Sequence, residues 1–244
     1  MIVLYKIDGV FFDFDNTIVD YRKADKKALN SVVDILKRDI DADEFIEVSG
    51  EKIMEFHGLV DKGAENPINM HKYRLQHTLQ HFSLKWEDRY LYTYLNQYIE
   101  STVCYPNVDD VLKLLYGNVR LGIVTNAYDS KEQRQRIRQT GLEEYFDDIV
   151  VCSDIGAYKP SKEAFLHLVS KYNFDPLSCL YIGDSEKYDI KGAKNAGLKT
   201  IKILHGRPQN NSTADFICED FEELLGLLKV LVAGLEYCNY HRKS

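Results

Sequence analysis

The sequence predicts an α/β protein with a doubly wound, mostly parallel sheet and an all-helical domain inserted into it. Two observations favour this class. Beyond residue 105 of the 244-residue chain, short apolar runs alternate with segments of helical periodicity, and continuously apolar strands are typical of a parallel sheet that helices cover on both faces. Before residue 105, one strand-like segment precedes a long block that shows helical spacing only.

The first element is a strand at 9–14, which is apolar except for Asp13. The block that follows has no convincing strand pattern, and its apolar residues recur at helical spacing, as in 28–36 and 91–99. Because this block interrupts the α/β pattern, we expect two domains. The predicted core domain is formed by 1–18 and 104–244, and the predicted helical domain by 19–103.

After the insertion, helices and strands alternate to the end of the sequence. The predicted strands are 119–125, 148–152, 179–183, 198–204 and 215–218. The predicted helices are 108–115, a segment ending near 140, 161–173, 187–196 and 221–235.

The composition excludes several function classes. The formal net charge of −7 argues against a general nucleic-acid binder, because basic surfaces hold phosphate backbones. The sequence has no apolar run of membrane-spanning length and no signal-peptide pattern, so we expect no membrane partner. Its five cysteines are scattered and form no C-x-x-C pair, which fits a reduced, cytoplasmic protein better than a disulfide framework or a zinc site.

Polar side chains follow three of the predicted strands where each strand ends. Asp13 and Asp15 end the first strand, Thr125 and Asn126 end the second, and Asp184 follows the strand 179–183. In an open parallel sheet the carboxyl ends of the strands form the ligand-binding edge. Close carboxylates repel one another, and hard oxygen ligands without nearby His or Cys favour Mg²⁺ over zinc. We therefore expect a magnesium site at this edge.

Four motifs in this order resemble those of the haloacid dehalogenase superfamily, and in particular its phosphatases with a helical cap after the first motif. They are Asp13-Phe14-Asp15-Asn16-Thr17, Thr125 in IVTNA, Lys159 in YKPSKEAF, and GDSEKYD with Asp184 and Asp189. The resemblance covers the whole chain and implies a Rossmann-like core. A short acidic motif alone arises by chance, but four motifs on the expected strand ends do not.

The resemblance also implies a role for each motif residue. Asp13 is the expected nucleophile, which forms an aspartyl-phosphate, and Asp15 the expected general acid and base. Thr125 and the Asn126 backbone amide are expected to bind the phosphoryl group. Lys159 is expected to neutralise charge on both Asp13 and the phosphoryl group.

The expected metal ligands complete this assignment. The resemblance implies that Mg²⁺ is held by Asp13, by the backbone carbonyl of Asp15, by Asp184, and by Asp189 either directly or through water. A turn directly after Asp13 would let the Asp13 and Asp15 carboxylates take different positions, since both side chains of a regular strand would point the same way.

The expected activity is hydrolysis of a small phosphorylated metabolite, such as a sugar phosphate or a nucleotide, by a monomer or homodimer. The helical domain would exclude water and select the substrate. Haloalkanoate dehalogenation is disfavoured because Asp15 is present. A phosphomutase would keep all four motifs and stays open. A scaffold protein without chemistry would have no need for Asp13, Asp15 or Lys159.

Overall fold

The computed structural model describes residues 7–208 and 211–240. It divides into two compact units. The core unit comprises residues 1–20, 104–133 and 140–244, and the helical unit comprises residues 21–103 with 134–139.

The core unit contains a six-stranded parallel sheet with the order β3-β2-β1-β4-β5-β6. Its strands are β1 (Gly9–Phe12), β2 (Arg120–Thr125), β3 (Asp148–Val151), β4 (Cys179–Gly183), β5 (Lys199–Ile203) and β6 (Phe216–Cys218). Phe12 is in register with Ile123 of β2 and Ile182 of β4, so three carboxyl ends lie next to one another. This sheet confirms the predicted α/β fold class.

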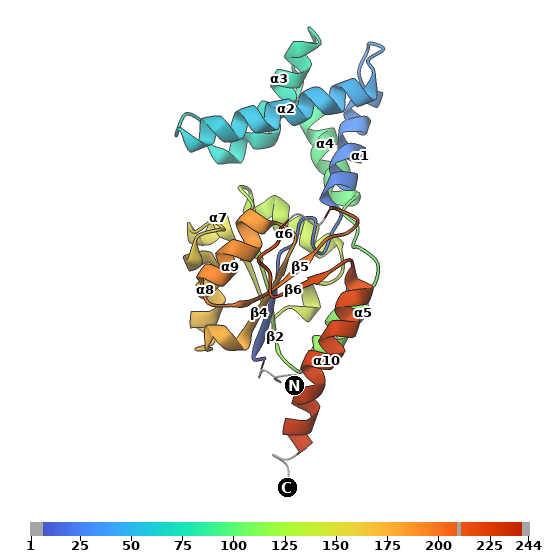
Figure 1. Cartoon of the computed structure of the whole chain (residues 1–244). Coiled ribbons are helices and arrows are strands. Elements are labelled where there is room, and N and C mark those ends of the chain that lie inside the picture. The colour runs from blue at the N-terminus through green and yellow to red at the C-terminus, as the bar shows by residue number, and fades with distance from the viewer. Residues whose placement is uncertain (1–6, 209–210, 241–244) are drawn as a thin grey trace. The chain divides into compact units, whose positions relative to one another are not determined.

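Helices of the core unit flank the sheet on two sides (Figure 1). They are α5 (Val108–Leu115), α6 (Ser130–Gln139, whose second half belongs to the helical unit), α7 (Cys152–Ile155), α8 (Lys162–Lys171), α9 (Lys191–Asn195) and α10 (Phe221–Tyr240). One-turn segments lie at η2 (Glu143–Tyr145), η3 (Pro176–Ser178) and η4 (Glu186–Ile190). Phe165 of α8 and Ala193 of α9 pack on Phe11 and Tyr181 of the sheet. Apolar residues on both strand faces thus explain the two covering layers.

The predicted helix 187–196 is in fact two elements. A π-helical turn, η4, precedes the short helix α9. The side chain of Ser185 accepts from the Tyr188 amide, and the Ser185 carbonyl accepts from the amides of Asp189 and Ile190. A π turn changes the direction of the side chains that follow it, and this one carries Asp189.

The helical unit consists of α1 (Tyr21–Asp34), α2 (Ala42–Asp61), η1 (Pro67–Asn69), α3 (Met70–His81) and α4 (Asp88–Glu100). Tyr90, Tyr94 and Tyr98 recur every four residues and share one buried face of α4. They pack with Leu29 of α1 and Phe45 of α2 in a common apolar cluster. The tyrosine stripe therefore forms helix packing within this unit.

Two further observations concern the long helices and the cysteines. No helix within 7–208 and 211–240 is long and apolar enough to cross a membrane. Cys104, Cys152, Cys179 and Cys218 are free thiols. The side chain of Cys238 lies outside the described residues.

Candidate active site

The first motif forms a tight turn at the carboxyl end of β1. Asp13 still pairs with the sheet, since its amide donates to the Ile182 carbonyl at 2.9 Å. The chain then reverses, because the amides of Thr17, Ile18 and Val19 all donate to the Phe14 carbonyl. Asn16 has a φ of 58°, a left-handed conformation that asparagine tolerates better than most residues. The turn sends the Asp13 and Asp15 carboxylates to different partners.

Lys159 is the cation of the site and lies buried between two carboxylates. Its Nζ donates to Asp13 Oδ1 at 2.6 Å and to Asp189 Oδ1 at 2.7 Å. A third hydrogen bond, 3.0 Å long, goes to the Tyr181 hydroxyl. Burial alone would lower the pKa of this lysine, but Asp13 and Asp189 outweigh it and raise the pKa well above its ordinary value. The lysine is therefore charged at neutral pH.

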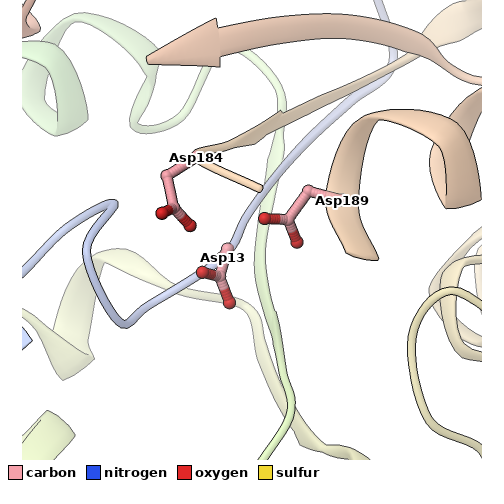
Figure 2. A group of neighbouring side chains, drawn as sticks. All are labelled: Asp13, Asp184 and Asp189. Carbon is pink, nitrogen blue, oxygen red and sulfur yellow. The ribbon is translucent and has the colours of Figure 1, made fainter. Parts of the chain in front are cut away.

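Three carboxylates from three different segments meet beside Lys159. Asp13, Asp184 and Asp189 each offer an oxygen, and these oxygens lie within 4.8 Å of one another. Figure 2 shows the three side chains pointing toward a common space from the turn after β1, the end of β4 and η4. The Ser185 amide donates to Asp189 Oδ2 at 2.9 Å and fixes its orientation. The structure thus brings together three of the residues that the sequence singled out.

Two carboxyl groups of this cluster have raised pKa values, and its three carboxylates outnumber the neighbouring cations Lys159 and Arg207. Burial raises the pKa of Asp13 well above its ordinary value, and Asp189 and Asp184 raise it further, although Lys159 opposes them. Burial and Asp189 raise the pKa of Asp184 to about 6, against the effect of Arg207. A divalent cation would supply the missing charge. The all-oxygen donor set, with no Cys or His, fits Mg²⁺ better than zinc.

The second motif forms a hydrogen-bonded bridge to the first. The amide Nε2 of Gln133 donates at 3.0 Å to Asp15 Oδ2 and at 3.0 Å to Thr125 Oγ1. The Asn126 side chain exchanges two hydrogen bonds with the backbone of Lys159. Of the seven residues singled out from the sequence, five lie at or just after the carboxyl ends of β1, β2 and β4. The other two are Lys159, between α7 and α8, and Asp189, on η4.

Residues 10–203 match the family of haloacid dehalogenase-like hydrolases. The chain belongs to this family. The resemblance inferred from the four motifs is therefore confirmed, and the chain is a hydrolase by family.

Individual relatives of this haloacid dehalogenase-like hydrolase align over most of its length. Glyceraldehyde 3-phosphate phosphatase of Pyrococcus abyssi is 27% identical over 229 residues, which cover 92% of this chain and 94% of the relative. N-acylneuraminate-9-phosphatase of Mus musculus is 26% identical over 203 residues, covering 80% and 82%. The solved structure of the putative hydrolase YfnB from Bacillus subtilis, described as bound to magnesium, has a TM-score of 0.77 at 25% identity and covers 91% of this chain and 99% of that one.

Three residues of the candidate site were not predicted from the sequence. Tyr181 carries the one hydroxyl group of the apolar strand CLYIG, and a polar group in such a strand could have indicated a site residue. Gln133 lies on α6 within a polar stretch where nothing distinguishes it from its neighbours. Arg207 lies shortly after the end of β5, and this position beside a strand end could have indicated a site residue.

Proposed function

We propose that this chain is a Mg²⁺-dependent phosphatase that hydrolyses small phosphate monoesters through an aspartyl-phosphate on Asp13. The observation that carries the proposal is the Asp13 carboxylate, which directly follows β1 and lies between the Lys159 ammonium and the carboxylates of Asp184 and Asp189. An attacking carboxylate and an anionic substrate repel each other, so the reaction needs cations at this position. The phosphatase names of the relatives support the same reaction class.

The residues divide the reaction into two steps. In the first, an Asp13 oxygen attacks phosphorus, the ester P–O bond breaks, and the Asp15 carboxyl gives its proton to the departing alkoxide. In the second, Asp15 takes a proton from a water molecule that attacks the same phosphorus, which frees phosphate and restores the Asp13 carboxylate. The hydrogen bonds of Asp15 to Gln133, and of Asp13 to Lys159, support this separation of roles.

The proposed metal ligands are the side chains of Asp13, Asp184 and Asp189 with the backbone carbonyl of Asp15. When bound, Mg²⁺ would neutralise charge on the phosphoryl oxygens. Thr125 would donate its hydroxyl hydrogen to a phosphoryl oxygen, since that hydroxyl accepts from Gln133. Lys159 would hold the Asp13 carboxylate in place and stabilise charge in the transition state.

The substrate is proposed to be a small phosphorylated metabolite, and substrate selection is proposed to lie in the helical unit. We propose that the core domain carries out catalysis and that the helical domain selects the substrate. A cytoplasmic location and a monomeric or homodimeric state stay predictions from the sequence.

The experiment that tests this function is phosphate release from a panel of substrates. The panel holds glyceraldehyde 3-phosphate, an N-acylneuraminate phosphate, sugar phosphates and nucleotides, each with Mg²⁺ and with EDTA. The matched variants are Asp13→Asn and Asp110→Asn, because Asp110 is an exposed aspartate of α5 away from the motifs.

We expect release that requires Mg²⁺, is unchanged in Asp110→Asn, and falls by at least ~10³-fold in Asp13→Asn because the nucleophile is gone. Release by Asp13→Asn at the wild-type rate would contradict the proposal. Interconversion of phosphate isomers without phosphate release would instead point to a phosphomutase.

A further inference from the structure

Arg207 joins three segments of the core unit beside the acidic cluster. Its Nη1 pairs with Asp184 Oδ2, and its Nη2 donates to the Asn16 carbonyl at 2.9 Å. Its Nε donates to the Leu204 carbonyl at 2.7 Å. The guanidinium therefore connects the end of β4, the turn of the first motif and the end of β5. A planar fork with several donors suits such a bridge, whereas a lysine ammonium is a point charge.

A built turn aims Arg207 at the site. The Arg207 amide donates to the Leu204 carbonyl at 3.1 Å. The two residues between them, His205 and Gly206, have φ values of 49° and 74°. Positive φ at both central residues defines a type I′ turn, which reverses the chain tightly. Because a non-glycine residue rarely adopts this conformation, the turn needs support from its surroundings.

His205 supplies that support. Its ring stacks on Tyr105 with the centroids 3.5 Å apart and the planes 11° from parallel. On its Nε2 side it lies 2.9 Å from the Thr17 carbonyl. The Asn16 and Thr17 carbonyls are thus held by two residues of one turn, Arg207 and His205. These contacts fix the turn of the first motif against the end of β5.

We propose that Arg207 is a positioning residue for the metal site, which holds the Asp184 carboxylate and the first-motif turn in the geometry that binds the cation. This inference rests on the proposed Mg²⁺ dependence. Groups that hydrogen-bond metal ligands fix the orientation of those ligands, and losing one costs 10- to 100-fold in metal affinity. Arg207 pairs with one carboxylate oxygen of Asp184, and a carboxylate has a second oxygen for a cation.

Charge repulsion acts in the opposite direction, because a guanidinium close to a divalent cation disfavours it. Two variants of Arg207 separate the positioning effect from the charge repulsion. Arg207→Lys keeps the charge and loses the fork, so only positioning changes. Arg207→Gln loses both. If Arg207 served mainly as a competing counter-ion of Asp184, Arg207→Gln would bind Mg²⁺ more tightly than the wild type.

The test is calorimetric titration of the full chain with Mg²⁺ in the absence of substrate. The matched controls are Arg120→Lys and Arg120→Gln. Arg120 also pairs with an aspartate, Asp147, but it begins β2 at the opposite end of the sheet from the acidic cluster. Unfolding temperatures without and with saturating Mg²⁺ are measured for each variant, so a general loss of stability is separated from a loss of metal binding.

We expect Arg207→Lys to bind Mg²⁺ about 10- to 100-fold more weakly, and both Arg120 variants to bind it like the wild type. The thermal shift caused by Mg²⁺ should shrink in Arg207→Lys accordingly. Unchanged affinity in Arg207→Lys, or tighter binding in Arg207→Gln, would overturn the inference. A wild-type chain that binds no Mg²⁺ would instead contradict the proposed function itself.

Discussion

At the scale of single residues, the central feature is a buried lysine whose contacts fix the position of the proposed nucleophile, Asp13. Lys159 is 4% exposed, and a buried ammonium is tolerated only when it is paired and hydrogen-bonded. Asp13, Asp189 and Tyr181 provide those partners. Tyr181 also donates to the Val124 carbonyl at 2.9 Å, which leaves its oxygen free to accept from Lys159.

Removal of the Tyr181 hydroxyl should therefore disturb Lys159 without removing charge. We expect Tyr181→Phe to lower kcat by about 10- to 100-fold, because a hydrogen bond to a charged group contributes about 1.5–3 kcal/mol. The matched control is Tyr172→Phe, whose hydroxyl bonds Asp148 at the start of β3. Steady-state kinetics of both variants check this, and equal losses in the two would assign the effect of Tyr181 to stability alone.

A second residue-scale prediction concerns Gly183, which ends β4 directly against Asp189. A Cβ atom there would lie 2.6 Å from the Cβ and Cγ of Asp189. We expect Gly183→Ala to cost about 1–3 kcal/mol in unfolding free energy and to weaken Mg²⁺ binding, because Asp189 must shift. The control is Gly50→Ala on α2, where nothing lies within 4 Å of the added atom.

In the control, the helix propensity of alanine should stabilise the chain by up to about 1 kcal/mol and leave Mg²⁺ affinity unchanged. Urea unfolding and calorimetry measure the two quantities separately. Wild-type Mg²⁺ affinity in Gly183→Ala would remove Asp189 from the proposed metal ligands.

At the scale of helices and strands, the helical unit contains a polar network that ties its four long helices together. Arg74 of α3 makes a two-pronged ion pair with Asp25 of α1, with both distances at 2.8 Å. Its Nε donates to Ser49 of α2 at 2.6 Å, and Tyr94 of α4 donates to Asp25 at 2.6 Å. Every partner of the buried guanidinium comes from a different helix, so the network fixes which helix faces lie against each other.

Breaking this pair from one side should be costly. We expect Arg74→Met to lower the unfolding free energy of the helical unit by about 3–5 kcal/mol, because Asp25 is left charged and buried without its partner. Lys26→Met removes the neighbouring but exposed Lys26–Asp43 pair and should cost at most about 1 kcal/mol. Urea unfolding followed by fluorescence reports this unit, since the single tryptophan of the chain, Trp86, packs against its core. Similar losses in both variants would contradict the network's role.

The same pair predicts a pH dependence. Burial would raise the pKa of Asp25, but Arg74 and Tyr94 outweigh it and lower the pKa below 3.8. A carboxyl with a lowered folded-state pKa contributes stability that is complete above its ordinary value and lost as pH falls through the folded value. We expect the stability gap between the wild type and Asp25→Asn, measured through Trp86, to be constant near neutral pH and to shrink below pH 3.8. A gap that widens on acidification would contradict this sign.

The elements were more predictable than the contacts that connect them. All six strands were identified because each is a short apolar run, and β4 was placed at its observed bounds. The strand expected at 9–14 ends at Phe12 because the next residues form a turn around the Phe14 carbonyl. The expected helix at 187–196 contains a π turn, since hydrogen bonds to Ser185 change the local winding. Hydrophobic periodicity does not reveal such local hydrogen bonds, so the turns they form could not be predicted from it.

At the scale of the whole molecule, the chain leaves the core unit and returns to it at neighbouring points. Val19 and Cys104 form an antiparallel bridge, and the Tyr105 amide donates to the Ile18 carbonyl at 2.9 Å. The core sheet is therefore continuous around an insertion of more than eighty residues. This topology explains how one chain can carry both the candidate site on the strand ends and a helical unit.

The proximity of the motif residues to one another was predictable, because three of the four motifs lie at the carboxyl ends of adjacent strands. The partners of the bridging residues Gln133, Tyr181 and Arg207 were not predictable, because each bridging side chain hydrogen-bonds a motif residue that lies far from it in sequence. The spacing of residues along the sequence does not indicate such pairs. Predicting them requires the sheet order, which brings β1, β2, β4 and β5 to one edge.

The most direct test of the central claim is chemical trapping of the intermediate during turnover. The Asp15→Asn variant is mixed with Mg²⁺ and a substrate with a good leaving group, so that the first step proceeds while the second lacks its base. The quenched protein is reduced with borohydride, which converts an aspartyl-phosphate to homoserine, and its peptides are analysed by mass spectrometry. We predict homoserine at position 13, which is absent with EDTA. Phosphate release without modification of Asp13, or with modification of another residue, would contradict the account.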